Sequence, residues 1–401
     1  MTAVGAAALR ARPVAAEDAD PGAQIEPFWG QHQAGILTPA QSHAIFAAFD
    51  LTTDARGKIA GLLRRWTVAA RHLSVGRPVD VPGDGEYETA PDPGDVAALS
   101  PSRLTATIGF GAGLFRKDGR DRYGLAAQRP EALVDLPAFP GDRLEPARTG
   151  GDLLVQVCAD DPQVAFHAIR QFAGIAHGVA AMRWMQGAFA ADQPPRNLMG
   201  FRDGTGNPRR DDPADMDRVV WVGEDGPAWM RGGTYQVVRR IRIALEKWDR
   251  AKLADQEATF GRRKTSGAPF GQAGEFDAVD LAARDPNGRL TIPDNAHVRL
   301  AHQAALDGAR VLRRSYSYVD GANVTTEPWP PFREAMEFDA GLVFVCFQRD
   351  PRDGFIKIYD RLSRSDRLGE FVTHTGGGLF ACPPGIAKGE FVGQRLLEEG
   401  A

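Results

Sequence analysis

One order of secondary-structure elements recurs in the two halves of this 401-residue chain. Alternating and helically spaced apolar residues in the first half predict a strand, a helix, two strands, a helix and a strand over residues 44–52, 54–73, 103–111, 151–159, 161–180 and 182–189. The second half predicts the same order over residues 233–245, 246–261, 310–319, 341–348, 354–363 and 376–383. This β-α-β-β-α-β order is that of a ferredoxin-like unit.

A short internal similarity supports the repeat. LLVQVCADDP (153–162) aligns with LVFVCFQRDP (342–351), and both apolar runs end in Asp-Pro. We therefore predict an α+β fold of two ferredoxin-like halves packed through their sheets, as in a dimeric α+β barrel. The predicted division is a tail or signal remnant over 1–25, an N-terminal half over 26–195 and a C-terminal half over 196–401, with the boundary in the Pro- and Asp-rich stretch near 190–230.

Two local features add to this outline. Asp54 precedes the first apolar-periodic segment and is a candidate N-cap for the helix over 54–73. Residues 76–102 are rich in Pro, Gly and Asp and predict a long loop. A loop of this length in a compact domain is more often functional than idle.

Composition excludes several classes of protein. The net charge of −4 implies no polyanion-binding surface, so nucleic acid is not an expected partner. The apolar runs fall short of the roughly 18 residues that a membrane span needs, so no span is expected. The three cysteines form no C-x-x-C pair, which argues against a zinc ribbon or an iron–sulfur cluster. The absence of C-x-x-C-H means that any haem would be held without thioether links.

The stretch NLMGFRDGTGNP (197–208) places Asp203 among glycines in a segment that cannot be a regular helix or strand. Alone it is equally compatible with a tight surface turn. Two later stretches change this interpretation, DNAHVRLAH (294–302) and VLRRSYSY (311–318). An isolated acid, a histidine and an arginine then occur in that order.

These strings resemble the dye-decolorising peroxidase family, in the branch of the bacterial deferrochelatase/peroxidases. EPFWGQHQAGI (26–36), GGTYQVVRRI (232–241) and GLVFVCFQRD (341–350) match as well, so the resemblance runs from about residue 26 to the end. It implies a peroxidase that binds one non-covalent haem b per chain. Such an enzyme reduces hydrogen peroxide and oxidises bulky aromatic donors via a ferryl intermediate.

The resemblance also assigns site residues. It implies His297 as the axial ligand of the haem iron, with Asp203 as the acid–base group and Arg313 as the fixed charge on the open face. Gly204, Thr205 and Gly206 are expected to run over the haem edge. The remaining expected pocket residues are His302, which stands where the family usually has asparagine and is expected near a propionate, and Leu342 and Phe344 on the distal wall.

An axial histidine usually donates its other ring proton to an acid. Asp339, just before the strand over 341–348, is the candidate, with Glu337 as the second choice and an ordinary exposed acid as the alternative. Leu342 and Phe344 are equally compatible with plain core packing.

Two other functions stay open. The branch resemblance also implies a deferrochelatase, which releases iron from haem with the porphyrin intact within an iron-uptake system, and a non-catalytic haem carrier on the same fold. Family members commonly self-associate, so a homo-oligomer is compatible with the sequence. The apolar run TAVGAAAL (2–9) resembles the end of a secretory signal, which favours a periplasmic protein over a cytoplasmic protein with a disordered tail. No twin-arginine pair precedes this run, and export by the twin-arginine route is what the family resemblance implies.

Overall fold

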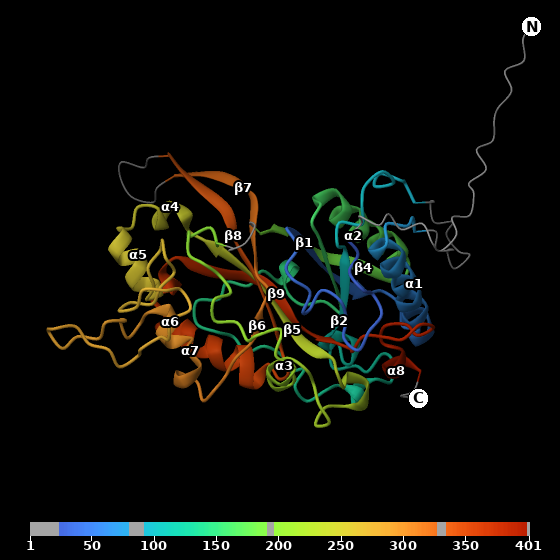
Figure 1. Ribbon diagram of the computed structural model, residues 1–401. Helices are drawn as coiled ribbons and strands as arrows, with labels where there is room; N and C mark the ends of the chain where they lie inside the picture. The colour runs from blue at the N-terminus through green and yellow to red at the C-terminus, as the bar shows by residue number, and fades with distance from the viewer. Residues whose placement is uncertain (1–23, 80–91, 191–195, 327–333, 399–401) are drawn as a thin grey trace, which may run out of the picture.

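The computed structural model describes residues 24–79, 92–190, 196–326 and 334–398 (Figure 1). Most of the expected tail and part of the expected loop over 76–102 lie outside these ranges, as does part of the stretch near 190–230. None of the described helices is long and apolar enough to cross a membrane. All three cysteines are buried and unpaired.

The N-terminal half is one ferredoxin-like unit. Its strands hydrogen-bond in the order β2-β3-β1-β4, all antiparallel. Apolar residues at helical spacing, among them Leu62, Trp66 and Leu73, bury the inner side of its first helix. The elements in chain order are β1 (His43–Leu51), α1 (Arg56–Ser74), β2 (Thr105–Gly111), β3 (Leu153–Ala159), α2 (Pro162–Ala176) and β4 (Ala180–Phe189).

The C-terminal half repeats the unit with the order β9-β5-β8-β7. Its principal elements are β5 (Thr234–Ile243), α4 (Leu245–Trp248), α5 (Leu253–Phe260), β7 (Tyr316–Thr326), β8 (Glu334–Gln348), α7 (Lys357–Ser365) and β9 (Val372–Cys382). The further short elements are α3 (Pro213–Val219), α6 (His297–Leu300), β6 (Leu312–Arg313) and α8 (Gln394–Leu397). The strands of the internal similarity, β3 and β8, occupy the same place in the two units.

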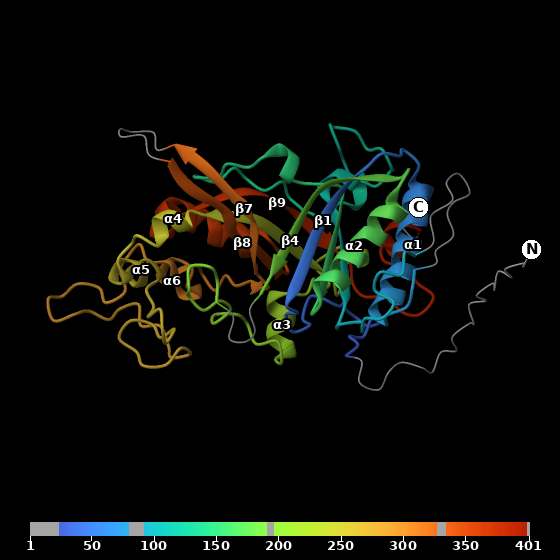
Figure 2. The ribbon, with the colours of Figure 1, turned by 90° about the horizontal axis from the view of Figure 1, so that it is seen from above.

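The two units join at both edges and share a core. β2 pairs with β9 and β4 pairs with β7, and because β5 also pairs with β8 the strands close into one ring. The residues between the two sheets are fully buried and include Phe46, Leu154, Val343 and Phe380. The helices cover the outer faces, with α1 and α2 at one end of the molecule and α4 to α7 at the other (Figures 1 and 2). The predicted fold class is therefore confirmed.

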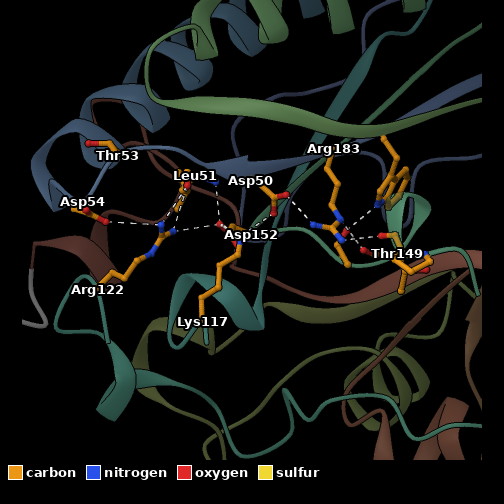
Figure 3. Close-up of polar contacts among 12 residues, drawn as sticks. Asp50, Leu51, Thr53, Asp54, Lys117, Arg122, Thr149, Asp152 and Arg183 are labelled. Atoms are coloured by element: carbon orange, nitrogen blue, oxygen red, sulfur yellow. Dashed lines mark hydrogen bonds and ion pairs between the residues drawn. The ribbon is translucent and has the colours of Figure 1, made fainter. Parts of the chain in front are cut away.

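A charged network fixes the loops of the N-terminal half (Figure 3). Asp152 is almost fully buried and binds Lys117 at 3.0 Å and Arg122 at 3.4 Å, while Asp50 binds Lys117 at 2.9 Å and Arg183 at 2.8 Å. A buried carboxylate needs such partners, because an unpaired buried charge is costly. Arg183 also donates to the carbonyl of Thr149 at 2.7 Å. Thr149 in turn forms a β-bridge with Gly377 of β9.

Three local predictions differ from the structure. The N-cap of α1 is Ala55 with no side-chain hydrogen bond, and Asp54 instead lies 3.8 Å from the guanidinium of Arg122. The helix predicted over 246–261 is two helices, because Lys252 takes an extended conformation between α4 and α5. The strand predicted over 310–319 is split into β6 and β7.

Candidate active site

The loop over 197–208 presents Asp203. Gly204 takes a φ of +87°, a conformation that side chains disfavour, and its N–H donates to the Asp203 carboxylate at 2.7 Å. Asn207 closes the loop onto β6, since its side-chain amide donates to the Arg313 carbonyl at 2.8 Å and accepts from the Arg313 N–H at 3.0 Å. One asparagine thereby holds the acid-bearing loop against the arginine-bearing strand.

The structure brings Asp203 and Arg313 together. The Nη1 atom of Arg313 lies 3.6 Å from Oδ1 of Asp203, and the two side chains are 28% and 21% exposed. Arg313 pairs with Cys346 on β8, and neighbours across a sheet share a face. Leu342 and Phe344 alternate onto that face and are half-buried, so they lie on the same side of the sheet as the arginine.

Arg314 points the other way, as strand alternation requires. It is 2% exposed and binds the carbonyl of Thr38 and the side chain of Gln41. Only the first arginine of the pair therefore reaches the face that carries Asp203.

His297 begins α6 and is held by an acid. Its Nδ1 lies 2.6 Å from Oδ2 of Asp366, which is 5% exposed. A carboxylate only accepts hydrogen bonds, so Nδ1 carries the proton and Nε2 is left with a lone pair. The other oxygen of Asp366 accepts from the Leu368 N–H at 2.8 Å, and Phe260 lies edge-on to the imidazole with 6.0 Å between ring centroids. The ring is thus fixed in orientation and tautomer.

The expectation that Asp339 partners His297 is wrong. Asp339 lies 2.7 Å from Arg240, and Glu337 lies 3.4 Å from Arg242. The reason is strand alternation: along β8 both acids point to the face opposite that of Leu342 and Phe344. Asp366 was missed because it follows α7 and is distant from His297 in sequence. Its one signal was the acid directly after an amphipathic helix, where it caps the next turn.

The apolar side chains of α7 and of the outer face of β8 are only partly buried. α7 has a polar and an apolar side, yet none of its residues is buried, whereas α1 buries nine. Its apolar residues Ile358, Tyr359 and Leu362 are only half-buried, like Leu342 and Phe344 on the sheet. Half-buried apolar side chains from two facing elements, next to an imidazole lone pair, fit a flat apolar group with a metal centre such as haem.

Polar and charged side chains cluster around Glu275 and Arg262. Thr205 donates to Glu275 at 2.8 Å, and the side chain of Arg202 binds the same carboxylate. Burial, and then the charge of Arg262, lower the pKa of His302. Burial is also the main cause of the lowered pKa of Arg262, with a further contribution from the charge of Arg313. Arg262 and Glu275 were missed in the sequence, because one lies at a helix end and the other in a long irregular segment.

Comparison with known proteins agrees with this geometry. The Dyp-type peroxidase N-terminal family model matches residues 33–190, and the Dyp-type peroxidase C-terminal model matches residues 194–387. The chain belongs to the Dyp-type peroxidase family. It is 36% identical to the deferrochelatase of Yersinia pseudotuberculosis over 389 residues, which cover 94% of this chain and 85% of the relative.

Solved structures give the same assignment. Ferric DtpA from Streptomyces lividans superposes with a TM-score of 0.83 at 43% identity and covers 94% of this chain and 98% of its own. A DyP-type peroxidase from Cellulomonas bogoriensis superposes with a TM-score of 0.82 at 40% identity, covering 95% and 100%. Members of this family are haem peroxidases, so this Dyp-type peroxidase is an oxidoreductase that uses haem, peroxide and organic donors.

Proposed function

We propose that the chain holds one non-covalent haem b, with Nε2 of His297 as the axial ligand. The support is the hydrogen bond at 2.6 Å between His297 Nδ1 and Asp366, which gives the imidazole the tautomer that a metal ligand needs. Leu342 and Phe344 would contact the ring, and Gly204, Thr205 and Gly206 would pass its edge. Arg262, Arg313 and His302 would supply donors for the propionates. Bound haem supplies the redox-active iron of the reaction.

The single observation that carries the peroxide chemistry is the pairing of Asp203 and Arg313 at 3.6 Å. A peroxide must lose a proton from one oxygen and gain one on the other before its O–O bond breaks. The Asp203 carboxylate accepts the first proton and returns it to the departing oxygen. The guanidinium of Arg313 stabilises the negative charge on that oxygen.

Two substitutions test these roles. Asp203→Asn removes the proton acceptor and Arg313→Leu removes the fixed charge, and each variant should keep its Soret band. Stopped-flow mixing with hydrogen peroxide should show the reaction slowed by about 10²–10⁴-fold for Asp203→Asn and about 10²–10³-fold for Arg313→Leu. Asp211→Asn is the matched control, because Asp211 lies in the same part of the chain and pairs with Arg209 in solvent. Parent rates in both variants would refute the assignment.

A deferrochelatase is the second candidate, because curated relatives at 36% identity carry that name. In that role haem would be a substrate, and the chain would deliver iron and free porphyrin to an iron-uptake system. Incubation with haem and a reductant, followed by porphyrin fluorescence and by an iron chelator, separates the two activities. Peroxide-dependent dye oxidation without porphyrin release would show that the chain is a peroxidase and not a deferrochelatase.

For localisation we propose export to the periplasm, supported by the apolar run over 2–9. The twin-arginine route rests on the resemblance to the family alone. Cell fractionation of the full-length gene product tests it, and a purely cytoplasmic product would contradict it. Self-association of the protein is a further proposal that size-exclusion chromatography with light scattering can decide.

A further inference from the structure

Three polar side chains meet in the N-terminal half, whereas the proposed haem site lies in the C-terminal half. His167 of α2 is 1% exposed, and its ring lies between Asp92 and Asp95 of the long loop before β2. Nδ1 of His167 is 2.7 Å from Asp95 Oδ1, and Nε2 is 3.3 Å from Asp92 Oδ2. Suitable ligand atoms of all three residues lie within 4.8 Å of one another.

The two sides of the imidazole differ. Nδ1 makes a hydrogen bond with Asp95, whereas Nε2 is a buried nitrogen without a hydrogen-bond partner in the described residues. With the proton on Nδ1, a lone pair on Nε2 faces an oxygen of Asp92, whose side chain is 6% exposed. Two electron-rich atoms that face each other out of water repel, and either a proton on Nε2 or a metal ion between Nε2 and Oδ2 relieves this repulsion.

The geometry favours a metal ion over a proton. In tetrahedral zinc sites with bonds of about 2.0–2.1 Å, two ligand atoms are separated by about 3.3–3.4 Å. The observed separation of 3.3 Å between Nε2 and Oδ2 matches this edge. A tetrahedral ion also places the oxygen about 35° off the axis of the nitrogen lone pair. A hydrogen bond prefers the oxygen on that axis, and none forms here.

The surrounding hydrogen bonds hold these side chains in place, as they do around metal ligands in proteins. Asp92 is itself held, because Oδ2 accepts from the Val79 N–H at 2.7 Å and Oδ1 accepts from the Gly94 N–H at 2.9 Å. Asp95 sits on the far nitrogen of the histidine, as in carboxylate–histidine–zinc arrangements. Arg170 lies 4.0 Å from the same Asp95 oxygen and balances its charge.

We propose that Asp92 and His167 bind a divalent ion of the zinc class, with Asp95 orienting the imidazole and solvent completing the coordination. The ion ties the loop before β2 to α2. Imidazole with carboxylate is a ligand set that zinc accepts, whereas calcium prefers oxygen ligands alone. This site is independent of the haem pocket, and the Soret band reports separately on the latter.

The test uses the haem-loaded full chain, with its purification tag removed and its metals stripped by a chelator. Isothermal titration with zinc chloride should show one site per chain. The isosteric variant Asp92→Asn should weaken binding at least tenfold, and Asp95→Asn by about tenfold. Zinc K-edge absorption should show one imidazole nitrogen among ligands at about 2.0–2.1 Å. Calcium chloride should bind more weakly than zinc.

His177→Gln is the matched control, because His177 ends the same helix α2 and is exposed. It should leave the titration unchanged. Equal zinc affinity in the parent and in Asp92→Asn, with both folded by circular dichroism, would overturn the proposal. Loss of the strong site in His177→Gln, or tighter binding of calcium than of zinc, would do the same.

Discussion

The bond between His297 and Asp366 illustrates how a residue far away in sequence can set the chemistry of a proposed haem ligand. Asp366 is 5% exposed and makes a second bond to the chain, so it cannot turn away from the imidazole. The sequence indicated the histidine, because its motif is local. It did not indicate the acid, because that pairing depends on how α6 and the end of α7 meet in space. The sequence indicated Asp203 and Arg313 for the same reason as His297, because each lies in a local motif, and the structure brings these two side chains together.

At this scale we expect Asp366→Asn to weaken the axial ligand without removing it. An amide is a poorer hydrogen-bond acceptor than a carboxylate, so the imidazole becomes a poorer electron donor. The reduction potential of the bound iron should rise, and haem affinity should fall by about 10–100-fold. Spectroelectrochemistry and haem titration measure the two effects. Asp360→Asn, an exposed acid of α7 that pairs with Arg364, is the control that should change neither.

At the scale of elements, the position of α6 depends on the end of α5. Gly261 ends α5 with a φ of +77°, and a Cβ there would lie 2.6 Å from Val298 and 2.9 Å from Ile292. The broken helix over 246–261 was not predicted, since its apolar spacing continues across residues 249–252. By contrast, most strands of both units were predicted within a few residues, because alternation and β-branching are local signals.

We therefore expect Gly261→Ala to displace the helix that carries His297. The added methyl group conflicts with the φ and with the side chain of Val298, which should cost about 1–3 kcal/mol of unfolding free energy. The fraction of the protein that retains haem should fall together with the unfolding free energy. Chemical denaturation and the ratio of Soret to protein absorbance measure both effects, and Gly369→Ala, where no atom lies near the added Cβ, is the control. An unchanged Soret ratio would contradict the expectation.

A second element-scale prediction concerns the segment that leads into β6. The guanidinium of Arg310 holds the pKa of Asp215 on α3 below its ordinary value, with a smaller contribution from Arg218. The carboxylate therefore stabilises the fold above its ordinary pKa of about 3.9, and this contribution disappears as the pH falls through the lower folded pKa.

Asp215→Asn should accordingly lower the unfolding free energy by about 1–3 kcal/mol at pH 7. The difference from the parent should shrink on acidification below about pH 4. Denaturation curves at a series of pH values test the sign. A difference that grows as the pH falls would show that the pair does not act as described.

At the scale of the whole molecule, the two units share a core and two strand pairings, so they cannot unfold independently at low cost. The repeat order and the similarity between β3 and β8 predicted two units. The strand pairs that join the units, β2–β9 and β4–β7, were not evident from sequence, because pairing between distant strands leaves no local pattern.

Phe380→Ala tests this integration. Phe380 is fully buried between the sheets, so its loss should cost about 3–5 kcal/mol. Far-UV circular dichroism, tryptophan fluorescence and the Soret band should still report coincident transitions at a lower denaturant concentration. Separate transitions would show that the halves unfold as independent domains. Phe276→Ala, at an exposed position, should leave stability unchanged.

The half-exposed apolar side of α7 also affects how stable the chain is in the cell before it binds its cofactor. Helix α1 of the N-terminal unit buries nine of its residues, whereas α7 of the C-terminal unit buries none, and the proposed haem would cover its apolar side. A newly made molecule would expose this apolar surface to proteases and chaperones, and binding of the cofactor would bury it. We expect the cellular amount of this enzyme to follow haem supply even when its transcription is held constant.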